Sequence, residues 1–405
     1  MNKPIYLDYN ATTPHDAEVI AAMRPYLEEH FGNPSSSHWY GIQTRNAIEH
    51  AREQVASLLN CLSKEIIFTS GGTEANNYAI RGIAGARKSK GNHIITTEIE
   101  HPAVLEVCRY LEKNGFEVTY LPVDESGLVS VSDVEKAITP QTILITIMHA
   151  NNEVGTVQPI EQISTMAKDH GIIVHTDAAQ SAGKIPVDVN ILGVDLLSIA
   201  GHKVYAPKGI GALYVRQGVE LESLLYGAGH EQGRRPGTEN VLEIVGLGTA
   251  CEIAGRNPEK NTVQMKKKRD RLFEGLKVNL KSLRLNGHPE RRLPNTLSLS
   301  FLGVEANQLL SEIGDNVAAS AGAACHSGGV EVSHVLKAMN IPVEWAKGTV
   351  RFSTGRMTTE SEIDKAVEVI SEAVRRLQTN SEVPFAGQPG LQRLTRQNPK
   401  KDNKE

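Results

Sequence analysis

Short apolar runs alternate with helix-like segments between residues 65 and 215, and this alternation constrains the fold more than any other feature of the sequence. The runs predict buried strands. They cover residues 65–69, 93–97, 118–121, 142–148, 172–176, 194–199 and 211–215. Because buried strands separated by helices form sheets covered on both faces, we expect an α/β fold with a largely parallel sheet.

The pattern changes after about residue 257. Lys260–Arg271 is rich in charge and predicts an exposed helix, whereas residues 293–301 and 349–353 predict strands. Glu360–Leu377 carries its apolar residues on one helical stripe, which is typical of an amphipathic helix. Fewer strands and more local helix indicate a second, smaller α+β domain.

These patterns predict the domain boundaries. We expect a large α/β domain over residues 15–257 and a small α+β domain built from residues 1–14 and 258–382. The segment 383–405 is polar, contains Pro and Gly, and carries five basic and two acidic side chains in its last 13 residues. We therefore expect a disordered basic tail there.

Composition excludes several classes of protein. A formal net charge of −4 argues against a general nucleic-acid binder. The 405 residues contain no apolar run near the roughly 18 residues of a membrane span, and the chain start has no apolar signal-peptide region. The four cysteines form no CxxC, so neither a zinc site nor a disulfide framework is indicated. We expect a reduced, cytoplasmic protein without a membrane partner.

Lys203 follows the end of one of the predicted buried strands. Residues 194–199 form the apolar run, Ala200 and Gly201 break it, and His202 and Lys203 come next. A partly desolvated ammonium group loses its proton more easily, so a lysine in this place suits Schiff-base chemistry. The alternative is an ordinary surface lysine near a turn.

Two other strand ends carry groups that would complement such a lysine. Ser70–Glu74 passes from strand to helix through two glycines and a threonine, which can form an anion cradle or only a tight turn. Asp177 ends an apolar strand and can pair with a protonated ring nitrogen or cap the next helix. Lysine, aspartate and anion cradle together describe a site for pyridoxal 5′-phosphate (PLP).

Three further residues are candidates for chemistry. His101 follows another predicted strand and could stack on a ring or move protons, although a structural histidine is the alternative. Cys325 lies among small residues that suit a mobile loop, where a thiol can become a nucleophilic thiolate instead of a buried apolar group. Arg351 lies in a predicted strand, where it forms either a structural ion pair or a clamp for a substrate carboxylate.

Taken together, the chain resembles the NifS/IscS-type cysteine desulfurases, fold-type I PLP-dependent transferases of the class V aminotransferase group. It looks most similar to the NifS branch. The matching segments run in order over nearly the whole chain and leave only the tail uncovered. They are LDYNATTP (7–14), SGGTEANN (70–77), EHPAV (100–104), NNEVG (151–155), HTDAAQSAGK (175–184), GHK (201–203), GHEQGRRPGTEN (229–240), SAGAAC (320–325) and VRFSTGR (350–356).

This resemblance implies a PLP site with assigned roles. Lys203 would hold the coenzyme as a Schiff base and move the α-proton, Asp177 would pair with the pyridinium, and Gln180 would contact the ring hydroxyl. His101 would stack over the ring and act as acid or base. Thr238 would reach the phosphate from the neighbouring subunit. The implied cofactor-binding residues are Gly72, Thr73, His101, Asn152, Asp177, Gln180, Gly201, His202, Lys203 and Thr238.

The resemblance also implies the reaction. Asn152 and Arg351 would orient the carboxylate of L-cysteine, and the catalytic residues would be Cys325, Lys203 and His101. Cys325 would attack the substrate sulfur, so that a persulfide remains on the protein and L-alanine leaves. The sulfur would supply Fe–S cluster assembly, and Cys325 could serve as a transient Fe–S ligand shared with a scaffold.

The implied partners are a second copy of the chain in a homodimer and an IscU/NifU-like scaffold as sulfur acceptor, with no nucleic acid. Two departures from the family concern Ala200, where many relatives carry a phosphate-binding Ser, and His326, where Thr is common. Alternative functions are a class V aminotransferase, a selenocysteine or cysteine-sulfinate lyase, or a scaffold or sulfur-carrier partner that binds PLP only vestigially.

Overall fold

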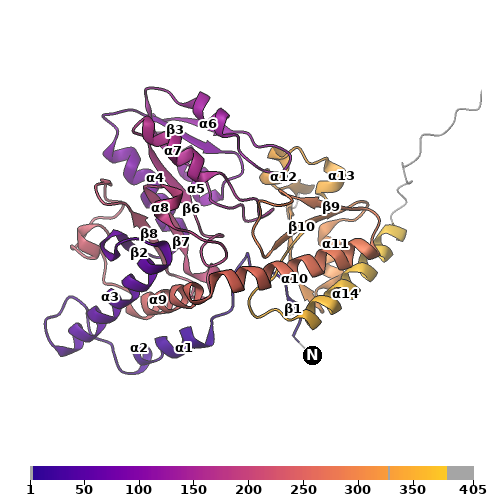
Figure 1. Cartoon of the computed structure of the whole chain (residues 1–405), viewed down its shortest axis with the longest axis horizontal. Helices are drawn as coiled ribbons and strands as arrows, with labels where there is room; N and C mark the ends of the chain where they lie inside the picture. The colour runs from indigo at the N-terminus through magenta and orange to yellow at the C-terminus, as the bar shows by residue number, and fades with distance from the viewer. Residues whose placement is uncertain (1–2, 327–328, 381–405) are drawn as a thin grey trace, which may run out of the picture.

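A computed structural model describes residues 3–326 and 329–380, and the side chains of residues 323–331 lie outside the described part. The predicted disordered tail, 383–405, also lies outside it. Figure 1 shows two bodies of secondary structure joined by a long helix, α10 (Pro258–Asn279).

The larger body is built around a seven-stranded sheet with the strand order β2-β8-β7-β6-β5-β3-β4. Strand β8 runs antiparallel to both β2 and β7, and the other neighbouring pairs are parallel, so the prediction of a largely parallel sheet is confirmed. The strands are β2 (Ile66–Thr69), β3 (His93–Thr97), β4 (Glu117–Leu121), β5 (Thr142–Thr146), β6 (Ile173–Asp177), β7 (Leu196–Ala200) and β8 (Gly211–Val215).

Helices cover both faces of this sheet, which explains why most of its strands are buried along their whole length. Successive strand residues point to opposite faces, so Ile66 and Phe68 enter one apolar core while Ile67 enters another. The first core is closed by α3 (Trp39–Leu59), α7 (Ile160–Asp169) and α9 (Val241–Arg256), and the second by α4 (Gly72–Ala86) and α5 (Pro102–Glu112). Shorter helices are α1 (Ala17–Met23), α2 (Pro25–Glu28), α6 (Val131–Ala137) and α8 (Val189–Leu192).

Helix α9 is not predicted by the sequence pattern. Its sequence, VLEIVGLGTACEIAGR, is apolar on most sides and contains three glycines, so it shows no amphipathic stripe. The glycines allow α9 to pack closely against α3 and α1. A Cβ at Gly248 would lie 2.6 Å from the Cα of Ala51, and one at Gly246 would lie 2.7 Å from the sulfur of Met23.

The smaller body has its own sheet and its own apolar core. Its sheet has the order β12-β15-β10-β9 and is antiparallel. Its core includes Leu7, Phe301, Phe352 and Ile370. The elements are β9 (Leu283–Asn286), β10 (Thr296–Phe301), β12 (Ser320–Ala321) and β15 (Thr349–Ser353), packed by α11 (Ala306–Ile313), α14 (Glu360–Asn380) and α10.

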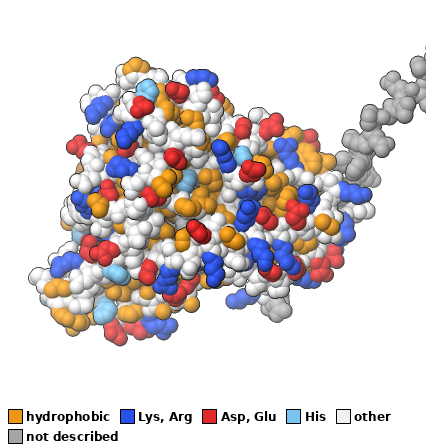
Figure 2. All heavy atoms as spheres, in the orientation of Figure 1, with side chains coloured by type: hydrophobic (Ala, Val, Ile, Leu, Met, Phe, Trp, Pro, Cys, Tyr) orange, Lys and Arg blue, Asp and Glu red, His pale blue; other side chains and the backbone are white. Residues whose placement is uncertain are grey.

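Charged side chains of both signs are interspersed over the α10 and α14 side of the smaller body (Figure 2). Lys267 pairs with Glu360 at 2.6 Å, and Arg271 pairs with Asp364 at 2.6 Å, so ion pairs join the two helices. The prediction of a charged, exposed helix at Lys260–Arg271 is confirmed, although the helix extends further in both directions.

The N-terminal segment links the two bodies. Strand β1 (Ile5–Tyr6) pairs in parallel with β11 (Val317–Ala318), and Asp8 forms an isolated bridge with Ser353. The chain then crosses to the larger body, where the backbone N–H of Thr13 donates to the carbonyl of His202 at 2.9 Å. Two separate cores support the expected two-domain division, and its boundaries stay a prediction.

The segment around Cys325 departs from the loop expected there. Its backbone forms strand β13 (Ala323–His326), which pairs antiparallel with β14 (Gly329–Val332), and Cys325 lies opposite Val330. The expectation of a loop at Cys325 is therefore wrong. Helices α12 (His334–Ala338) and α13 (Val343–Ala346) follow, and α12 buries Leu336 in the core of the larger body. No helix within residues 3–326 and 329–380 is long and apolar enough to cross a bilayer.

Candidate active site

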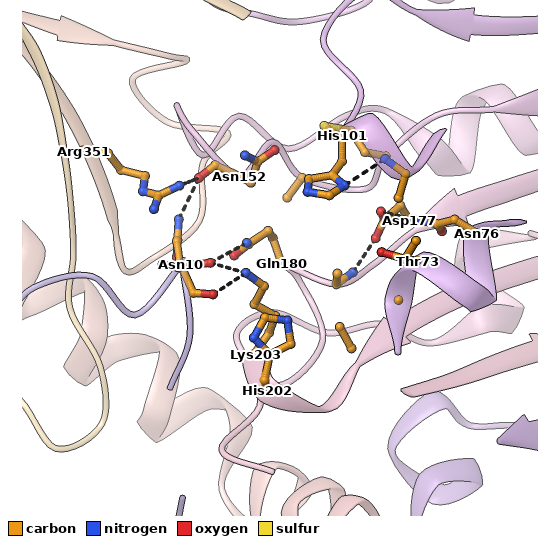
Figure 3. A pocket seen from close by; sticks show the side chains of 17 residues that line it. Asn10, Thr73, Asn76, His101, Asn152, Asp177, Gln180, His202, Lys203 and Arg351 are labelled. Carbon is orange, nitrogen blue, oxygen red and sulfur yellow. Dashed lines mark hydrogen bonds between the residues drawn. The ribbon is translucent and has the colours of Figure 1, made fainter. Parts of the chain in front are cut away.

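A cavity of about 420 Å³ opens at the carboxyl ends of the parallel strands (Figure 3). Chain segments that follow β2, β3, β5, β6 and β7 all reach it, because these strands end at one edge of the sheet. The cavity brings together most of the predicted site residues. They are Gly72, Thr73, His101, Asn152, Asp177, Gln180, His202, Lys203 and Arg351.

The turn after β7 places Lys203 in this cavity. A short 3-10 turn, Gly201–Lys203, follows the strand, and a Cβ at Gly201 would lie 2.7 Å from the side chain of Ile210, so only glycine fits. Tyr205 then takes a φ of +71°, a rare conformation for a bulky residue that marks a constrained site. The predicted lysine at a strand end is confirmed as a cavity residue.

The amine of Lys203 is held by backbone oxygen atoms. Its Nζ donates to the carbonyl of Asn10 at 2.6 Å and to that of Ala11 at 2.7 Å. Burial, reinforced by the charge of Arg351, lowers the pKa of Lys203 to about 8 against the opposing effect of Asp177. A neutral, nucleophilic amine is therefore more available near neutral pH than at an ordinary lysine.

Asp177 lies at the end of β6 and is only 7% exposed. Its Oδ2 accepts from Nδ2 of Asn76 at 2.7 Å, and its Oδ1 accepts from the N–H of Ala179 at 2.9 Å. The residues after it form turns rather than a helix, so the alternative of a helix cap is wrong. A fixed carboxylate facing the cavity fits a protonated ring nitrogen.

The start of α4 has the geometry that an anion cradle requires, and its role in binding an anion stays a prediction. Gly71 has a φ of +149°, which favours glycine, and the helix begins at Gly72 with the exposed side chain of Thr73 next to it. Unpaired N–H groups at a helix start attract a phosphate. A Cβ at Gly72 would lie 3.2 Å from the Cβ of Ala200, so small residues on both segments leave room for an anion.

Two histidines flank the lysine. Nδ1 of His101 accepts from the N–H of Ala103 at 3.1 Å and so caps α5, while the ring lines the cavity. His101 therefore caps a helix, as the structural interpretation expects, and also lines the cavity, as the functional interpretation requires. Partial burial lowers the pKa of His101, and burial beside Lys203 lowers the pKa of His202 to about 4. Both rings are mainly neutral at pH 7.

Arg351 enters the cavity from β15 of the smaller body. Its guanidinium donates to Oδ1 of Asp8 at 2.8 Å and to the carbonyl of Asn152 at 3.0 Å. The ion pair considered for Arg351 is thus present, yet its buried Nε has no hydrogen-bond partner in the described structure. Arg351 also lines the cavity, where its positive charge can attract an anionic ligand.

Two predicted site residues do not line the cavity, and the side chain of a third lies outside the described part of the structure. Gly201 supports the turn but does not line the cavity, and Thr238 is exposed and lies outside it. The side chain of Cys325 lies outside the described residues, so its expected roles as nucleophile and as Fe–S ligand stay predictions. Among the described side chains, no group of three metal-ligating residues occurs.

The sequence analysis missed Asn76 and Asn10 as cavity residues. Asn76 is one helical turn beyond the anion cradle, and its Oδ1 is buried without a partner among the described groups. Asn10 is 1% exposed and hydrogen-bonds to both bodies, including Ser353 and Thr296 of the smaller one. Asn10 lies in the segment LDYNATTP (7–14) and Asn76 in SGGTEANN (70–77). Membership of these two segments is the sequence feature that could have identified them as site residues.

Comparisons with known proteins agree with this site. The family described as aminotransferase class-V matches residues 5–366. A protein of Dictyoglomus turgidum named cysteine desulfurase IscS is 49% identical over 382 residues, covering 94% of this chain and 97% of the relative. One of the same name from Methanosarcina thermophila is 49% identical and covers 94% of both chains.

Solved structures show the same architecture. A structure titled NifS-like protein has a TM-score of 0.87 at 38% identity and covers 92% of this chain and 100% of its own. Another, titled SspA in complex with cysteine, has a TM-score of 0.77 at 40% identity and covers 88% of this chain and 100% of its own. The strand-end cavity, the fold and these matches over most of the sequence lead to one conclusion: the chain belongs to the aminotransferase class-V family.

Proposed function

We propose that this chain is a PLP-dependent cysteine desulfurase that takes sulfur from L-cysteine and releases L-alanine. The observation that carries the proposal is the arrangement of Lys203, Asp177 and the start of α4 around one cavity. An amine, a fixed carboxylate and a helix N-terminus match the aldehyde, ring nitrogen and phosphate of PLP. Curated relatives named cysteine desulfurase support the choice of reaction.

When bound, PLP withdraws electrons from the Cα of an attached amino acid and so makes its α-proton acidic. The residues of the chain supply the remaining functions. Lys203 binds the coenzyme and moves the α-proton, because its amine has a lowered pKa and lies within the cavity. Asp177 holds a negative charge opposite the ring nitrogen, and His101 lines the cavity beside it.

The substrate carboxylate would bind at the opposite wall. The guanidinium of Arg351 lines the cavity there, and its position is fixed by Asp8 and by the backbone of Asn152. A guanidinium held in this way can orient a carboxylate without having to be ordered on binding. The amino end of the substrate would then face Lys203.

Cys325 is the proposed acceptor of sulfur. Burial raises the pKa of Cys61, Cys108 and Cys251 to about 12, so none of the three described thiols suits a nucleophile. In the proposed step the thiolate of Cys325 attacks the substrate sulfur. The S–S bond of a persulfide forms as the Cβ–S bond breaks, and protons delivered to carbon complete L-alanine.

The partners belong to the same proposal. A second copy of the chain would bring Thr238 to the phosphate, and the exposure of Thr238 on its own chain supports this. The segment carrying Thr238 is anchored by a buried ion pair between Arg52 and Glu231, whose N–O distance is 2.7 Å. An Fe–S scaffold protein in the cytoplasm would accept the sulfur.

The test is treatment of the PLP-loaded protein with L-cysteine. We expect stoichiometric persulfide on Cys325 by mass spectrometry, equimolar alanine, and loss of both in Cys325→Ala. Unchanged alanine release by Cys325→Ala would contradict the desulfurase mechanism and indicate a lyase that does not need this thiol. A protein that binds no PLP would contradict the proposal altogether.

A further inference from the structure

Lys184 is a buried amine that the proposed mechanism does not use. It lies in the turn after β6, is 6% exposed, and ends the segment HTDAAQSAGK. Its Nζ donates to Oε1 of Gln180 at 2.8 Å and to Oδ1 of Asn10 at 3.2 Å. Among the described residues, no carboxylate lies within ion-pair distance of it, so both of its recorded side-chain partners are neutral amides.

Keeping an amine in such a place is costly. Transfer of a charged ammonium from water into the protein interior is strongly unfavourable without a counter-ion. Burial, together with the nearby charges of Lys203 and Arg351, lowers the pKa of Lys184 well below its ordinary value. A methionine or leucine would fill the same space without this cost, so the hydrogen bonds of Lys184 have to explain its presence.

The hydrogen bond to Gln180 fixes how that side chain is turned. Nζ of Lys184 donates to Oε1, so the amide oxygen faces Lys184. Nε2 then faces the other way, where it donates to the carbonyl of Asn10 at 3.0 Å. A flipped amide would place Oε1 against the carbonyl oxygen of Asn10, where neither atom can donate a hydrogen bond. The second N–H of Nε2 remains available to the cavity that Gln180 lines (Figure 3).

The same amine also holds Asn10. Oδ1 of Asn10 accepts from Lys184 and, at 3.0 Å, from Nδ2 of Asn295 in the smaller body. Lys184 therefore contacts Gln180 and Asn10, which both line the cavity. The carbonyl of Asn10 also accepts a hydrogen bond from Lys203.

We propose that Lys184 is a positioning residue, which fixes the side-chain amide of Gln180 and the position of Asn10 so that an N–H of Gln180 is directed at the ring hydroxyl of PLP. This inference rests on the proposed function, because Gln180 acts on the coenzyme only if PLP binds in this cavity. Lys184 itself does not line the cavity.

The test is a double-mutant cycle on coenzyme affinity. Lys184→Met removes the donor and keeps an unbranched side chain, and we expect it to weaken PLP binding about fivefold in equilibrium dialysis, the usual effect of one lost hydrogen bond. Gln180→Leu should weaken binding to a similar degree. In Gln180→Leu, the further change Lys184→Met should weaken PLP binding clearly less than it does in the wild type, because the part of the effect that acts through Gln180 is already lost and only the contact with Asn10 remains.

Two additional variants separate positioning from general stability. Thr262→Val removes a hydrogen bond of 2.8 Å to the backbone carbonyl of Lys184 but leaves its Nζ in place. We expect it to lower the melting temperature without changing PLP affinity. Lys184→Gln keeps an N–H donor and should bind PLP with an affinity between those of wild type and Lys184→Met. If Lys184→Met does not fold, the cycle is carried out with Lys184→Gln.

Defined outcomes would overturn the inference. Wild-type PLP affinity in Lys184→Met, or an equal loss of affinity with and without Gln180→Leu, would show that Lys184 does not act through Gln180. Failure of the proposed function is distinguishable, because it would appear in the wild-type protein as absent PLP binding or absent alanine release. A wild type that binds PLP and releases alanine, with an unaffected Lys184→Met, contradicts this inference alone.

Discussion

The two walls of the cavity are built in different ways. On the wall formed by the larger body, Asp177 and Lys203 follow the ends of neighbouring parallel strands, and the sheet itself sets their spacing. On the opposite wall, Arg351 comes from the smaller body and is joined through hydrogen bonds to Asp8, 343 residues away in sequence. Arg351 is itself paired in the smaller sheet, opposite Ser298 and Ser320. The first wall is thus set within one sheet, whereas the second belongs to another sheet and is joined to the larger body by polar contacts.

Under the proposed function, this difference would separate binding of the coenzyme from binding of the substrate. Groups at strand ends keep their positions as long as the sheet persists, which suits chemistry that needs fixed geometry. Groups held by a few polar contacts depend on each of those contacts. Changes at the first wall should therefore alter coenzyme chemistry, and changes at the second should alter mainly the affinity for L-cysteine.

The largest expected effect is at Lys203. Lys203→Ala should lower alanine formation by about 10²–10⁴-fold through lost proton transfer alone, since that is the usual contribution of general acid–base catalysis. The absorbance of the Schiff base between PLP and the protein should also disappear. Steady-state assays and absorbance spectra check both. A variant that retains most of its activity would show that the first wall is not where the chemistry occurs.

Changes at the second wall should raise the KM for L-cysteine. Arg351→Met should raise the KM for L-cysteine and lower kcat/KM by about 100-fold, because hydrogen bonds to charged groups contribute about 1.5–3 kcal/mol. Asp8→Asn keeps the guanidinium and removes only its anchor, so its effect should have the same sign and be smaller. An Arg351→Met variant with reduced kcat and unchanged KM would break the proposed separation between the walls.

A smaller effect is expected at Asn76, whose side chain holds Asp177 in the first wall. Asn76→Ala removes the hydrogen bond to Asp177 and should weaken PLP binding about fivefold, as one lost hydrogen bond does. Asn77→Ala is a matched control, because Asn77 bonds only the backbone carbonyl of Thr73 among its recorded contacts and does not line the cavity. Equal losses in both variants would count against a role of Asn76 at Asp177.

The rate at which the coenzyme-free protein captures PLP should depend on pH, and this dependence tests how the two walls influence each other. The amine of Lys203 is protonated below its pKa and reacts only when neutral, so the rate of PLP capture by coenzyme-free protein should rise with pH and level off above about 8. Stopped-flow absorbance measures this rate. Arg351→Met should move the midpoint upward, because the Arg351 charge helps to lower the pKa of Lys203. A wild-type midpoint near the ordinary lysine value of about 10.4 would contradict the assignment.

Much of the first wall could be predicted from the sequence. Apolar runs locate strands, and parallel strands end at one edge, so the sequence alone was enough to place Asp177 and Lys203 together. The second wall could not be predicted in the same way. The alternation of strands and helices does not indicate which residue pairs with Asp8. The strand at Cys325 forms by pairing with residues 329–332, and the small residues around Cys325 do not predict this pairing.

Asn10 and Lys184 illustrate the same limit. Each is an ordinary polar residue in sequence, and its importance comes from partners brought close only by the tertiary fold. The helix α9 was missed for a related reason, since its glycines are selected by the close approach of Ala51 and Met23 rather than by helix propensity.

The early position of Asn10 in the chain has a consequence for biosynthesis. Its backbone N–H bonds the hydroxyl of Ser353, which a ribosome adds 343 residues later. At about 5–20 residues per second, translation takes roughly 20–70 s to cover that interval. A nascent chain could assemble its large sheet during this time, but the pocket would close only near release. Under the proposed function, loading with vitamin B6 phosphate would therefore be a late event in the life of each new molecule, and truncated translation products would not sequester the coenzyme.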